Sequence, residues 1–314
     1  MKDLLRTEHL SRADVELLLV TAAEFAENPL RSNTALANKT VAIYMTKPST
    51  RTRLSAETAV AHLGGTPIFI RGDELQLGRG ETIEDTAKII SGYCSALIIR
   101  TFAQSDVDQL GAFASIPVIN ALTDVDHPTQ LLADWLTIRE NFGTDIAGRK
   151  FVYLGDGNNM SHAWLIMGAI MGAHVVAATP SGKWAPDPVV VAVAKNIAAN
   201  SGGKVEVTND PEDAAKDASV LYTDVWMSMG DSESDRKEKV QALSPFAVTE
   251  QLMKLASKDS LFMHCLPAHR GEEVEANVID GPRSVIWREA YHRRTTIQAI
   301  LYHLVRGDLK GYTH

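Results

Sequence analysis

The chain has 314 residues, a formal net charge of −8 and a sequence pI near 5.7. Its composition, 45% hydrophobic and 22% charged, is typical of a globular protein, and its length predicts about two domains. The acidic balance without a run of Lys or Arg argues against nucleic acid as a partner. No stretch approaches the ~20 apolar residues of a membrane span. A charged N-terminus and only two cysteines, Cys94 and Cys265, predict a cytoplasmic protein.

The first half of the chain alternates predicted helices and strands. Hydrophobic periodicity and turn residues predict an N-terminal amphipathic helix and then four strand–helix units. A polar, glycine-punctuated loop over 72–81 is predicted as a connection or a mobile lid. The helices are expected at 9–26, 49–63, 82–93, 107–114 and 131–141, and the strands at 41–45, 67–70, 96–99 and 117–119.

A second alternating series follows Gly143 to Gly148, the predicted hinge. Strands are expected at 151–154, 174–178, 205–207, 220–224 and 261–263. Helices are expected between the 155–159 loop and the strand at 174–178, and at 187–201, 212–217 and 293–305. The segment from Asp231 to Lys239 is highly charged and is predicted to be exposed. The pattern predicts an α/β protein of two domains, each a parallel sheet flanked by helices.

Polar clusters follow the predicted strands repeatedly, in both halves of the chain. Ligands of parallel α/β sheets bind beyond the carboxyl ends of the strands. Six such clusters therefore favour an active site in a cleft between the two domains. They are residues 49–53, Arg100, 127–130, 156–159, Asp224 and His264-Cys265.

Lys47-Pro48-Ser49-Thr50-Arg51-Thr52-Arg53 is the most informative stretch of the first half. Pro48 disfavours helix at the residue before it, and Ser49 is a good N-cap residue, so a helix is expected to begin there. The free N–H groups of its first turn, the hydroxyls and the arginines together form a predicted anion site. The simpler interpretation is a capped helix with two solvated arginines.

Two further polar positions of the first half are ambiguous when taken alone. Arg100 at a strand end is either a surface residue or a ligand for phosphate or a carbonyl. His127 precedes Pro128, which suits the first turn of a helix, and Gln130 lies on the same helical face. The alternative is a helix-capping histidine. A metal site at His127 is disfavoured because no other ligand-type residue lies at suitable spacing.

The second half offers a dinucleotide-like motif, Gly155-Asp156-Gly157-Asn158-Asn159-Met160, after a strand. The third glycine is absent, and the next strand ends without the acidic residue that binds ribose. Nicotinamide binding is therefore disfavoured, and Asn159 is predicted to hold a small substrate. Asp224 with Ser228 suits an ammonium group, although a strand-ending turn is the simpler interpretation. Cys265 is predicted to contact substrate rather than to act as a covalent nucleophile, because adjacent strand residues point to opposite sides.

Taken as a set, these motifs resemble the aspartate/ornithine carbamoyltransferase family along nearly the whole chain. The D-x-x-x-S-M-G and H-C-L-P motifs point to the ornithine branch of the family. The motifs are S-T-R-T-R at 49–53, L-Q-L-G-R-G-E at 75–81, Arg100 in I-I-R-T, H-P-T-Q at 127–130, G-D-G-N-N at 155–159, D-V-W-M-S-M-G at 224–230, H-C-L-P at 264–267 and Arg293.

The resemblance implies roles for individual residues. The domain over 1–142, with a C-terminal helix at about 290–314 packed on it, would bind carbamoyl phosphate, and the domain over 149–289 would bind ornithine. The residues for carbamoyl phosphate would be Ser49, Thr50, Arg51, Thr52, Gln76, Arg100, His127, Pro128, Thr129, Gln130, Cys265, Leu266 and Arg293. Those for ornithine would be Asn159, Asp224, Ser228 and Met229, and the catalytic groups would be Arg100, His127 and Cys265.

The implied reaction is attack of the neutral side-chain amine of ornithine on carbamoyl phosphate, which gives citrulline and phosphate. Arg100 and His127 would stabilise the oxyanion. No metal or organic cofactor is expected, and the family implies a homotrimer or a multiple of trimers. In the family, Glu-Asn commonly precedes this arginine, whereas Tyr291-His292 precedes Arg293 here. Arg294 lies beside Arg293 and is therefore a second candidate for the contact with carbamoyl phosphate.

Three rival interpretations remain open from the sequence. Within the family, the acceptor could be putrescine or an acylated ornithine, although Asp224 with Ser228-Met229 favours free ornithine. An NAD-dependent dehydrogenase is disfavoured by the missing glycine and acid. A catalytically silent subunit that binds a partner enzyme is disfavoured because every polar position that the family uses is filled.

Overall fold

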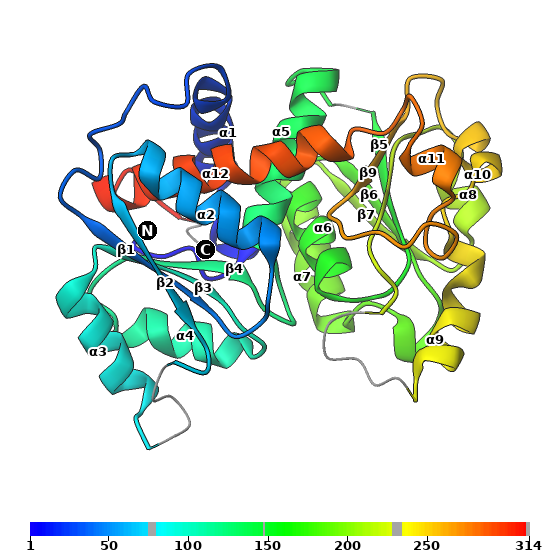
Figure 1. Cartoon of the computed structure of the whole chain (residues 1–314). Helices are drawn as coiled ribbons and strands as arrows, with labels where there is room; N and C mark the ends of the chain where they lie inside the picture. The colour runs from blue at the N-terminus through cyan, green and yellow to red at the C-terminus, as the bar shows by residue number, and fades with distance from the viewer. Residues whose placement is uncertain (75–79, 147, 228–233, 312–314) are drawn as a thin grey trace. The chain divides into compact units, whose positions relative to one another are not determined.

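The computed structural model describes residues 1–74, 80–146, 148–227 and 234–311. The chain forms two compact units: Met1–Leu136 with Tyr291–His314, and Thr137–Ala290. The boundaries fall inside two long helices, α5 (Pro128–Phe142) and α12 (Ile286–Arg306) (Figure 1). Each unit is an α/β structure with its own parallel sheet, so the predicted fold class is confirmed.

The first unit contains a four-stranded parallel sheet in the order β2-β1-β3-β4. Strand order reverses beside β1, so the segments that follow β1 and β3 leave the sheet in opposite directions. This is the type of position at which open α/β sheets bind ligands. The strands are β1 (Thr40–Met45), β2 (Thr66–Arg71), β3 (Ala96–Arg100) and β4 (Val118–Leu122).

Helices cover both faces of this sheet. Tyr44, Leu97 and Ile99 form one face and pack against Ile90 and Leu110, which belong to the two helices below the sheet in Figure 1. The other face carries the helix that follows β1. The helical elements before α5 are η1 (Thr7–His9), α1 (Arg12–Glu27), α2 (Thr50–His62), α3 (Ile83–Tyr93) and α4 (Gln104–Phe113).

The second unit contains a five-stranded parallel sheet in the order β7-β6-β5-β8-β9. Its order reverses between β5 and β8, and the G-D-G-N-N segment and Asp224 follow these two strands. The topology therefore brings both motifs to one switch point. The strands are β5 (Lys150–Leu154), β6 (His174–Ala178), β7 (Lys204–Thr208), β8 (Ala218–Thr223) and β9 (Leu261–His264).

One face of this sheet forms a core with the short helices on the right of Figure 1, through Val152, Leu221, Leu252 and Val278. The long helices α6 and α7 lie on the opposite face. The elements are α6 (Asn159–Ile170), η2 (Gly182–Trp184), α7 (Pro188–Ser201), α8 (Pro211–Ala215), α9 (Arg236–Leu243), η3 (Ser244–Phe246), α10 (Glu250–Leu255) and α11 (Ala276–Ile279).

Two local predictions are wrong. The C-terminal helix begins at Ile286 rather than Arg293, because Ile286 and Glu289 are buried at helical spacing and extend its packed face. Lys239 is buried, with 3% of its surface exposed, although its charged segment was predicted to be exposed. The other described residues of that segment are exposed or half-buried, in keeping with the prediction. The α10 and α11 helices were not predicted, and both are too short to give a clear helical period.

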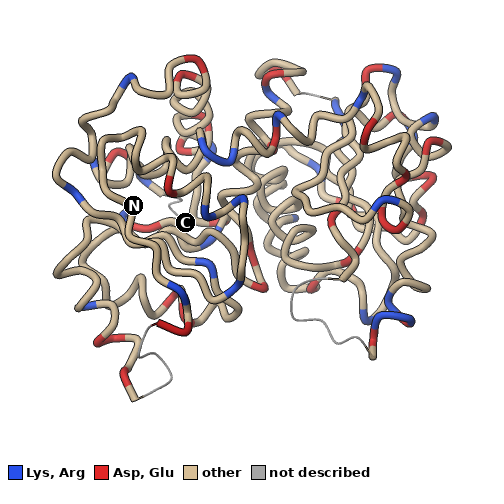
Figure 2. The backbone as a smooth tube through the Cα atoms, viewed as in Figure 1, with Lys and Arg blue, Asp and Glu red and all other residues tan. Residues whose placement is uncertain are grey.

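Charged residues of both signs are interspersed along the backbone of each unit (Figure 2). Among the helices of the described residues, none combines the length and apolar character needed to cross a bilayer. Cys94 and Cys265 are both thiols.

Candidate functional site

Ser49 caps helix α2, as predicted. Its backbone is extended, and its Oγ accepts a hydrogen bond from the N–H of Thr52 at 3.2 Å. The same Oγ lies 3.1 Å from Thr52 Oγ1. Thr50 is the exposed first residue of the helix, and Arg51 is half-buried in its first turn. The start of α2 thus presents hydroxyls, a guanidinium and the positive end of the helix dipole together.

Thr52 Oγ1 is the point at which two arginines from distant parts of the chain converge. Arg100 Nη1 and Arg293 Nη2 each lie 3.4 Å from it. Arg293 Nη1 donates to Gln130 Oε1 at 2.5 Å, and Gln130 in turn donates to Asp134. Both arginines are buried, with 7% and 3% of their surfaces exposed. The first unit therefore brings together four residues predicted to bind carbamoyl phosphate.

His127 is buried in the loop after β4 and directly precedes α5. The helix begins at Pro128, a residue suited to its first turn, three residues before the predicted start at 131. Its ring Nδ1 lies 3.4 Å from Thr129 Oγ1. The backbone N–H of His127 donates to Asp126 Oδ1 at 2.7 Å, which fixes the turn before the helix. Burial, together with the positive charges of Arg293, Arg100 and Arg51, holds the pKa of His127 well below its usual range. The imidazole is therefore neutral at neutral pH, inside a cationic cluster suited to an anion.

We expect the His127 ring to remain neutral as the pH falls past the ordinary histidine pKa of about 6.5. Because the unfolded chain gains this proton and the folded chain does not, the contribution of His127 to stability is lost as the pH falls below about 6.5. Ring-carbon NMR signals, assigned with a His127→Gln variant, measure this directly. A titration midpoint near the ordinary value would contradict the cationic environment.

In the second unit, Asp224 follows β8 and is buried, with 8% of its surface exposed. Its Oδ1 lies 2.9 Å from the Cys265 thiol, which donates to it. Its Oδ2 accepts a hydrogen bond from Asn158 Nδ2 at 3.2 Å. A carboxylate, a thiol and an amide from three separate loops therefore meet at one edge of the sheet. Cys265 and Asp224 were predicted as site residues, whereas Asn158 was not.

His264, the last residue of β9, and Cys265, which follows it, have different hydrogen-bond partners, as predicted from their adjacent positions. His264 Nδ1 accepts from the N–H of Leu266 at 2.8 Å, and its Nε2 faces Glu273 Oε1 at 3.3 Å. Leu266 has a left-handed backbone with φ of +57°, which is uncommon for a residue with a side chain. His264 therefore fixes the backbone of the turn, and the Cys265 thiol donates to Asp224.

The loop between β5 and α6 is built differently from a dinucleotide-binding loop. Asn158 caps α6 with its own side chain, whose Oδ1 accepts from the N–H groups of Met160 and Ser161 at 2.9 and 3.2 Å. These are the N–H groups that a pyrophosphate would need. Gly157 lies so close to the backbone of Ala185 that an added Cβ would be 2.2 Å from its carbonyl carbon. Gly157 is therefore required for the packing of this loop against Ala185, and not for binding a ligand.

An ion pair between Lys239 and Asp156 joins α9 to this loop, with the two charged atoms 2.7 Å apart. Only 4% and 9% of the two side chains are exposed, and the Lys239 ammonium lies 5.1 Å from the Trp184 ring centre. The sequence prediction missed this contact. Leu243 lies four residues after Lys239, on the same face of the helix, and is also buried. Its apolar side chain is the one signal in the sequence that this face is packed against the protein.

We expect Lys239→Met to lower the free energy of unfolding by about 3 kcal/mol, because it leaves the buried Asp156 carboxylate without this cation. Denaturant unfolding followed by tryptophan fluorescence measures the change. Lys237→Met on the same helix is the control, and we expect it to change stability by no more than about 0.5 kcal/mol. Equal stability of the two variants would contradict the importance of the pair.

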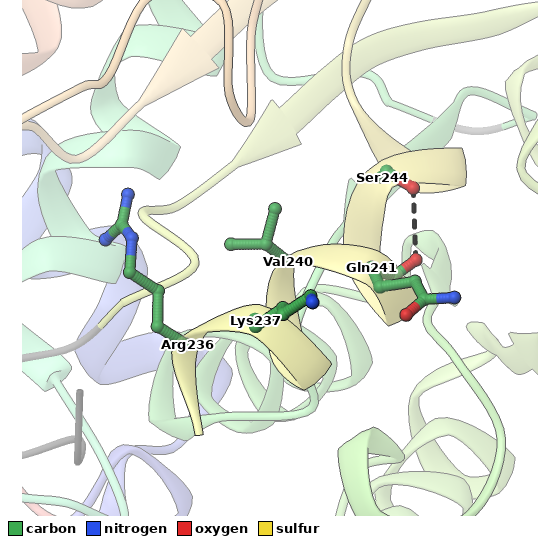
Figure 3. Close-up of a pocket in the computed structure, with 5 residues that line it drawn as sticks. All are labelled: Arg236, Lys237, Val240, Gln241 and Ser244. Atoms are coloured by element: carbon green, nitrogen blue, oxygen red, sulfur yellow. Dashed lines mark hydrogen bonds between the residues drawn. The ribbon is translucent and has the colours of Figure 1, made fainter. Parts of the chain in front are cut away.

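A separate pocket lies along α9 and is lined by Arg236, Lys237, Val240, Gln241 and Ser244 (Figure 3). The Ser244 hydroxyl donates to the backbone carbonyl of Gln241, which closes one end of the helix. None of these five residues was predicted as a site residue, so this pocket is distinct from the residues described above.

The other described residues predicted for the site lie in the turns and helix starts that follow the strands. Pro128 and Thr129 are buried in the first turn of α5. Asn159 is the half-buried first residue of α6, and Leu266 follows Cys265 in the turn after β9. Gln76, Ser228 and Met229 lie outside the described residues.

The fold and its polar residues define a class: a two-unit α/β protein with a cationic set of side chains in one unit and an acidic, thiol-containing set in the other. Family models agree with this division. One described as the carbamoyl-P binding domain of aspartate/ornithine carbamoyltransferase matches residues 2–140, and one described as the Asp/Orn binding domain matches residues 147–304.

Individual proteins match over nearly the full length. An ornithine carbamoyltransferase from Pyrococcus horikoshii is 47% identical over 313 residues, which cover 99% of this chain and 98% of the relative. The anabolic ornithine carbamoyltransferase of Pyrococcus furiosus is 47% identical over 311 residues, or 98% of each chain. A solved structure of ornithine carbamoyltransferase from Pyrococcus furiosus superposes with a TM-score of 0.92 at 46% identity and covers 98% of each chain. The chain belongs to the aspartate/ornithine carbamoyltransferase family, as its motifs predicted.

Proposed function

We propose that the chain is an ornithine carbamoyltransferase of arginine metabolism. It transfers the carbamoyl group of carbamoyl phosphate to the side-chain amine of L-ornithine and releases L-citrulline and phosphate. The observation that carries the proposal is the convergence of Arg100 and Arg293 on Thr52, at the N-terminus of α2 and beside neutral His127. This cluster suits a phosphorylated, carbonyl-containing substrate.

In the proposed reaction the ornithine amine forms a bond to the carbamoyl carbon, and a tetrahedral oxyanion results. Arg100 and His127 donate hydrogen bonds to the oxyanion; removing one such donor typically costs about 3–4 kcal/mol. The bond from carbon to the phosphate oxygen then breaks, the electron pair leaves with phosphate, and the amine loses a proton. Arg51 and Arg293 balance the charge of the departing phosphate. No metal or organic cofactor is needed because phosphate is a good leaving group.

Asp224 is proposed to bind the ammonium of the amino-acid end of ornithine, with Asn159, Ser228 and Met229 as further contacts. Its position supports this role, because Asn158 and Cys265 hold both carboxylate oxygens in place. The same argument favours ornithine over putrescine, which has no amino-acid end. The relatives named above as ornithine carbamoyltransferases support the same branch.

A citrulline assay with carbamoyl phosphate tests the function. Ornithine, N-acetylornithine, putrescine and aspartate are supplied separately as acceptors, and turnover is expected with ornithine alone. Turnover with another acceptor would retain the anion site and overturn the role of Asp224. Absence of turnover with all four would favour a silent subunit.

Cys265→Ser is expected to retain activity, with kcat/KM for ornithine reduced by about tenfold or less. A serine hydroxyl can still donate to Asp224 Oδ1, as the thiol does at 2.9 Å. Cys265→Ala removes this donor and is expected to be the more damaging variant. Steady-state kinetics of the two variants measure the difference. Complete loss of turnover in Cys265→Ser would instead indicate covalent catalysis by the thiol.

We further propose a cytoplasmic homotrimer, or a multiple of trimers, that works in the biosynthetic direction. The two thiols support the location, and the relative named as anabolic supports the direction. Light scattering coupled to size-exclusion chromatography measures the assembly. A monomer at working concentration would overturn the trimer.

A further inference from the structure

The turn from His269 to Val274, in the second unit, is a compact structure outside the proposed active site. The N–H of Glu272 donates to the carbonyl of His269 at 2.9 Å, and Gly271 has a left-handed backbone with φ of +89°. The N–H of Gly271 donates to the carbonyl of Val274 at 2.8 Å. This folding brings three ligand-type side chains, His269, Glu272 and Glu273, to one place within five residues of sequence.

Their ligand atoms face one another. His269 Nδ1 lies 3.9 Å from Glu272 Oε2 and 3.9 Å from Glu273 Oε2, and all three atoms lie within 4.8 Å of one another. Ligands of a tetrahedral zinc ion at about 2.1 Å are about 3.4 Å apart, so each of the two 3.9 Å distances from the histidine nitrogen must shorten by about 0.5 Å. His269 is half-exposed, so its ring can move toward the two carboxylates and a metal ion can reach the site from solvent.

The carboxylate oxygens provide a second, independent observation. Glu273 is fully buried, and its Oε2 has no hydrogen-bond partner among the described residues. Glu272 Oε2 is likewise buried without a hydrogen bond. A buried carboxylate oxygen normally accepts a hydrogen bond or binds a cation. Both oxygens are directed to the histidine nitrogen, which leaves a polar site for one small cation.

We propose that His269, Glu272 and Glu273 form a binding site for one divalent transition-metal ion of the zinc or cobalt type. One imidazole nitrogen and two carboxylate oxygens are a suitable ligand set for such ions, and a solvent molecule completes the coordination. Neither the sequence motifs nor the proposed reaction uses these residues. The site is therefore additional to the carbamoyl-transfer site.

The neighbouring charges are consistent with a cation here. Arg236 Nη2 donates to Glu272 Oε1 at 2.5 Å, so this hydrogen bond uses the oxygen that is not proposed as a ligand. Arg270 is held by both oxygens of Asp280 at 2.8 and 2.6 Å and does not compete for the two glutamates. Glu273 Oε1 accepts from the N–H of His269 and faces His264 Nε2. Each glutamate thus keeps one oxygen, Oε2, for the metal.

A second cluster, Asp224, His264 and Cys265, also has ligand atoms within 4.8 Å of one another, but its atoms are already engaged. Cys265 donates to Asp224, and His264 Nδ1 accepts from the N–H of Leu266. A metal there would have to replace these bonds. The two clusters also differ in chemistry, because only the second contains sulfur.

Cobalt(II) titration of the full-length protein at about pH 7.5, above the ordinary pKa of histidine, tests the proposal. We expect one equivalent to bind and to give visible ligand-field bands without the ultraviolet charge-transfer band of a cobalt–thiolate bond. His269→Ala and Glu272→Gln are each expected to weaken binding by at least about tenfold. Glu273 is left unchanged because it also supports the backbone of its turn.

Two control variants are matched to the rival explanations. Cys265→Ser removes the sulfur of the second cluster, and His174→Ala removes another histidine that contacts a carboxylate, Glu206, at 2.7 Å. Both are expected to bind cobalt as the unmodified chain does. Zinc is also expected to raise the unfolding temperature of the unmodified chain but not of His269→Ala.

The alternatives lead to different outcomes. Loss of binding in Cys265→Ser with retention in His269→Ala would overturn the proposal in favour of the second cluster. Equal weak binding in all variants would indicate non-specific surface binding and would also overturn it. Absence of any cobalt binding by the folded, unmodified protein would overturn it directly. None of these outcomes depends on whether the protein transfers carbamoyl groups.

Discussion

Arg293→Lys is expected to lower kcat for carbamoyl transfer by about 100- to 1,000-fold, the effect of losing one preorganised donor. The Arg293 guanidinium contacts Gln130 with one terminal nitrogen and Thr52 with the other. Arg293 is buried, with 3% of its surface exposed. A lysine ammonium is a single point and cannot hold both partners. Its charge remains, so the loss would report geometry rather than net charge.

Arg294→Lys is the matched control, because it makes the same change one residue further on. Arg294 contacts His62, Gln298 and Tyr291, none of which is a predicted site residue. We expect its kcat to stay within about threefold of the unmodified enzyme. Steady-state kinetics with both substrates varied compare the two variants. A larger loss in Arg294→Lys than in Arg293→Lys would reverse the assignment of these arginines.

This pair of residues also shows the limit of the sequence. The resemblance assigned the contact with carbamoyl phosphate to Arg293, but the altered neighbours Tyr291-His292 left the adjacent Arg294 as a second candidate. Adjacent helix positions differ by about 100° around the axis, so they face different surroundings. Only the packing of α12 shows that Arg293 is directed to Gln130 and Thr52.

The start of α2 could be predicted almost completely because its determinants are local. Pro48 and Ser49 set the N-terminus of the helix, and the hydroxyls and Arg51 follow from the chain itself. The parallel sheets were predictable for a similar reason, since each buried strand is a short apolar run. The motif resemblance then supplied the long-range relation among the site residues.

Contacts between distant loops could not be predicted in this way. Asn158 appeared in the sequence as part of a glycine-rich turn, yet it caps α6 and also donates to Asp224, 66 residues away. The Lys239–Asp156 ion pair was hidden because a charged segment usually lies in solvent. Both depend on which loops the sheet topology brings together at the ends of β5 and β8.

Asp224→Asn is expected to raise KM for ornithine by about 100-fold, in keeping with the ~2–5 kcal/mol cost of removing one partner of a buried charge pair. The amide retains the shape of the carboxylate but cannot neutralise the substrate ammonium. One of its polar atoms also becomes a donor, which conflicts with the thiol of Cys265 or the amide of Asn158. KM for carbamoyl phosphate is expected to change by less than about threefold.

This asymmetry between substrates distinguishes a binding role from a loss of folding, because a misfolded enzyme loses both substrates. Asp259→Asn is the control in the same unit: Asp259 is exposed and pairs with Arg149 at 3.2 Å, and it precedes β9, whereas Cys265 follows the other end of that strand. Its kinetics are expected to match those of the unmodified chain. If Asp224→Asn raised the two KM values equally, Asp224 would be a structural support and the ammonium would bind elsewhere. An unchanged KM for ornithine would exclude Asp224 from substrate binding altogether.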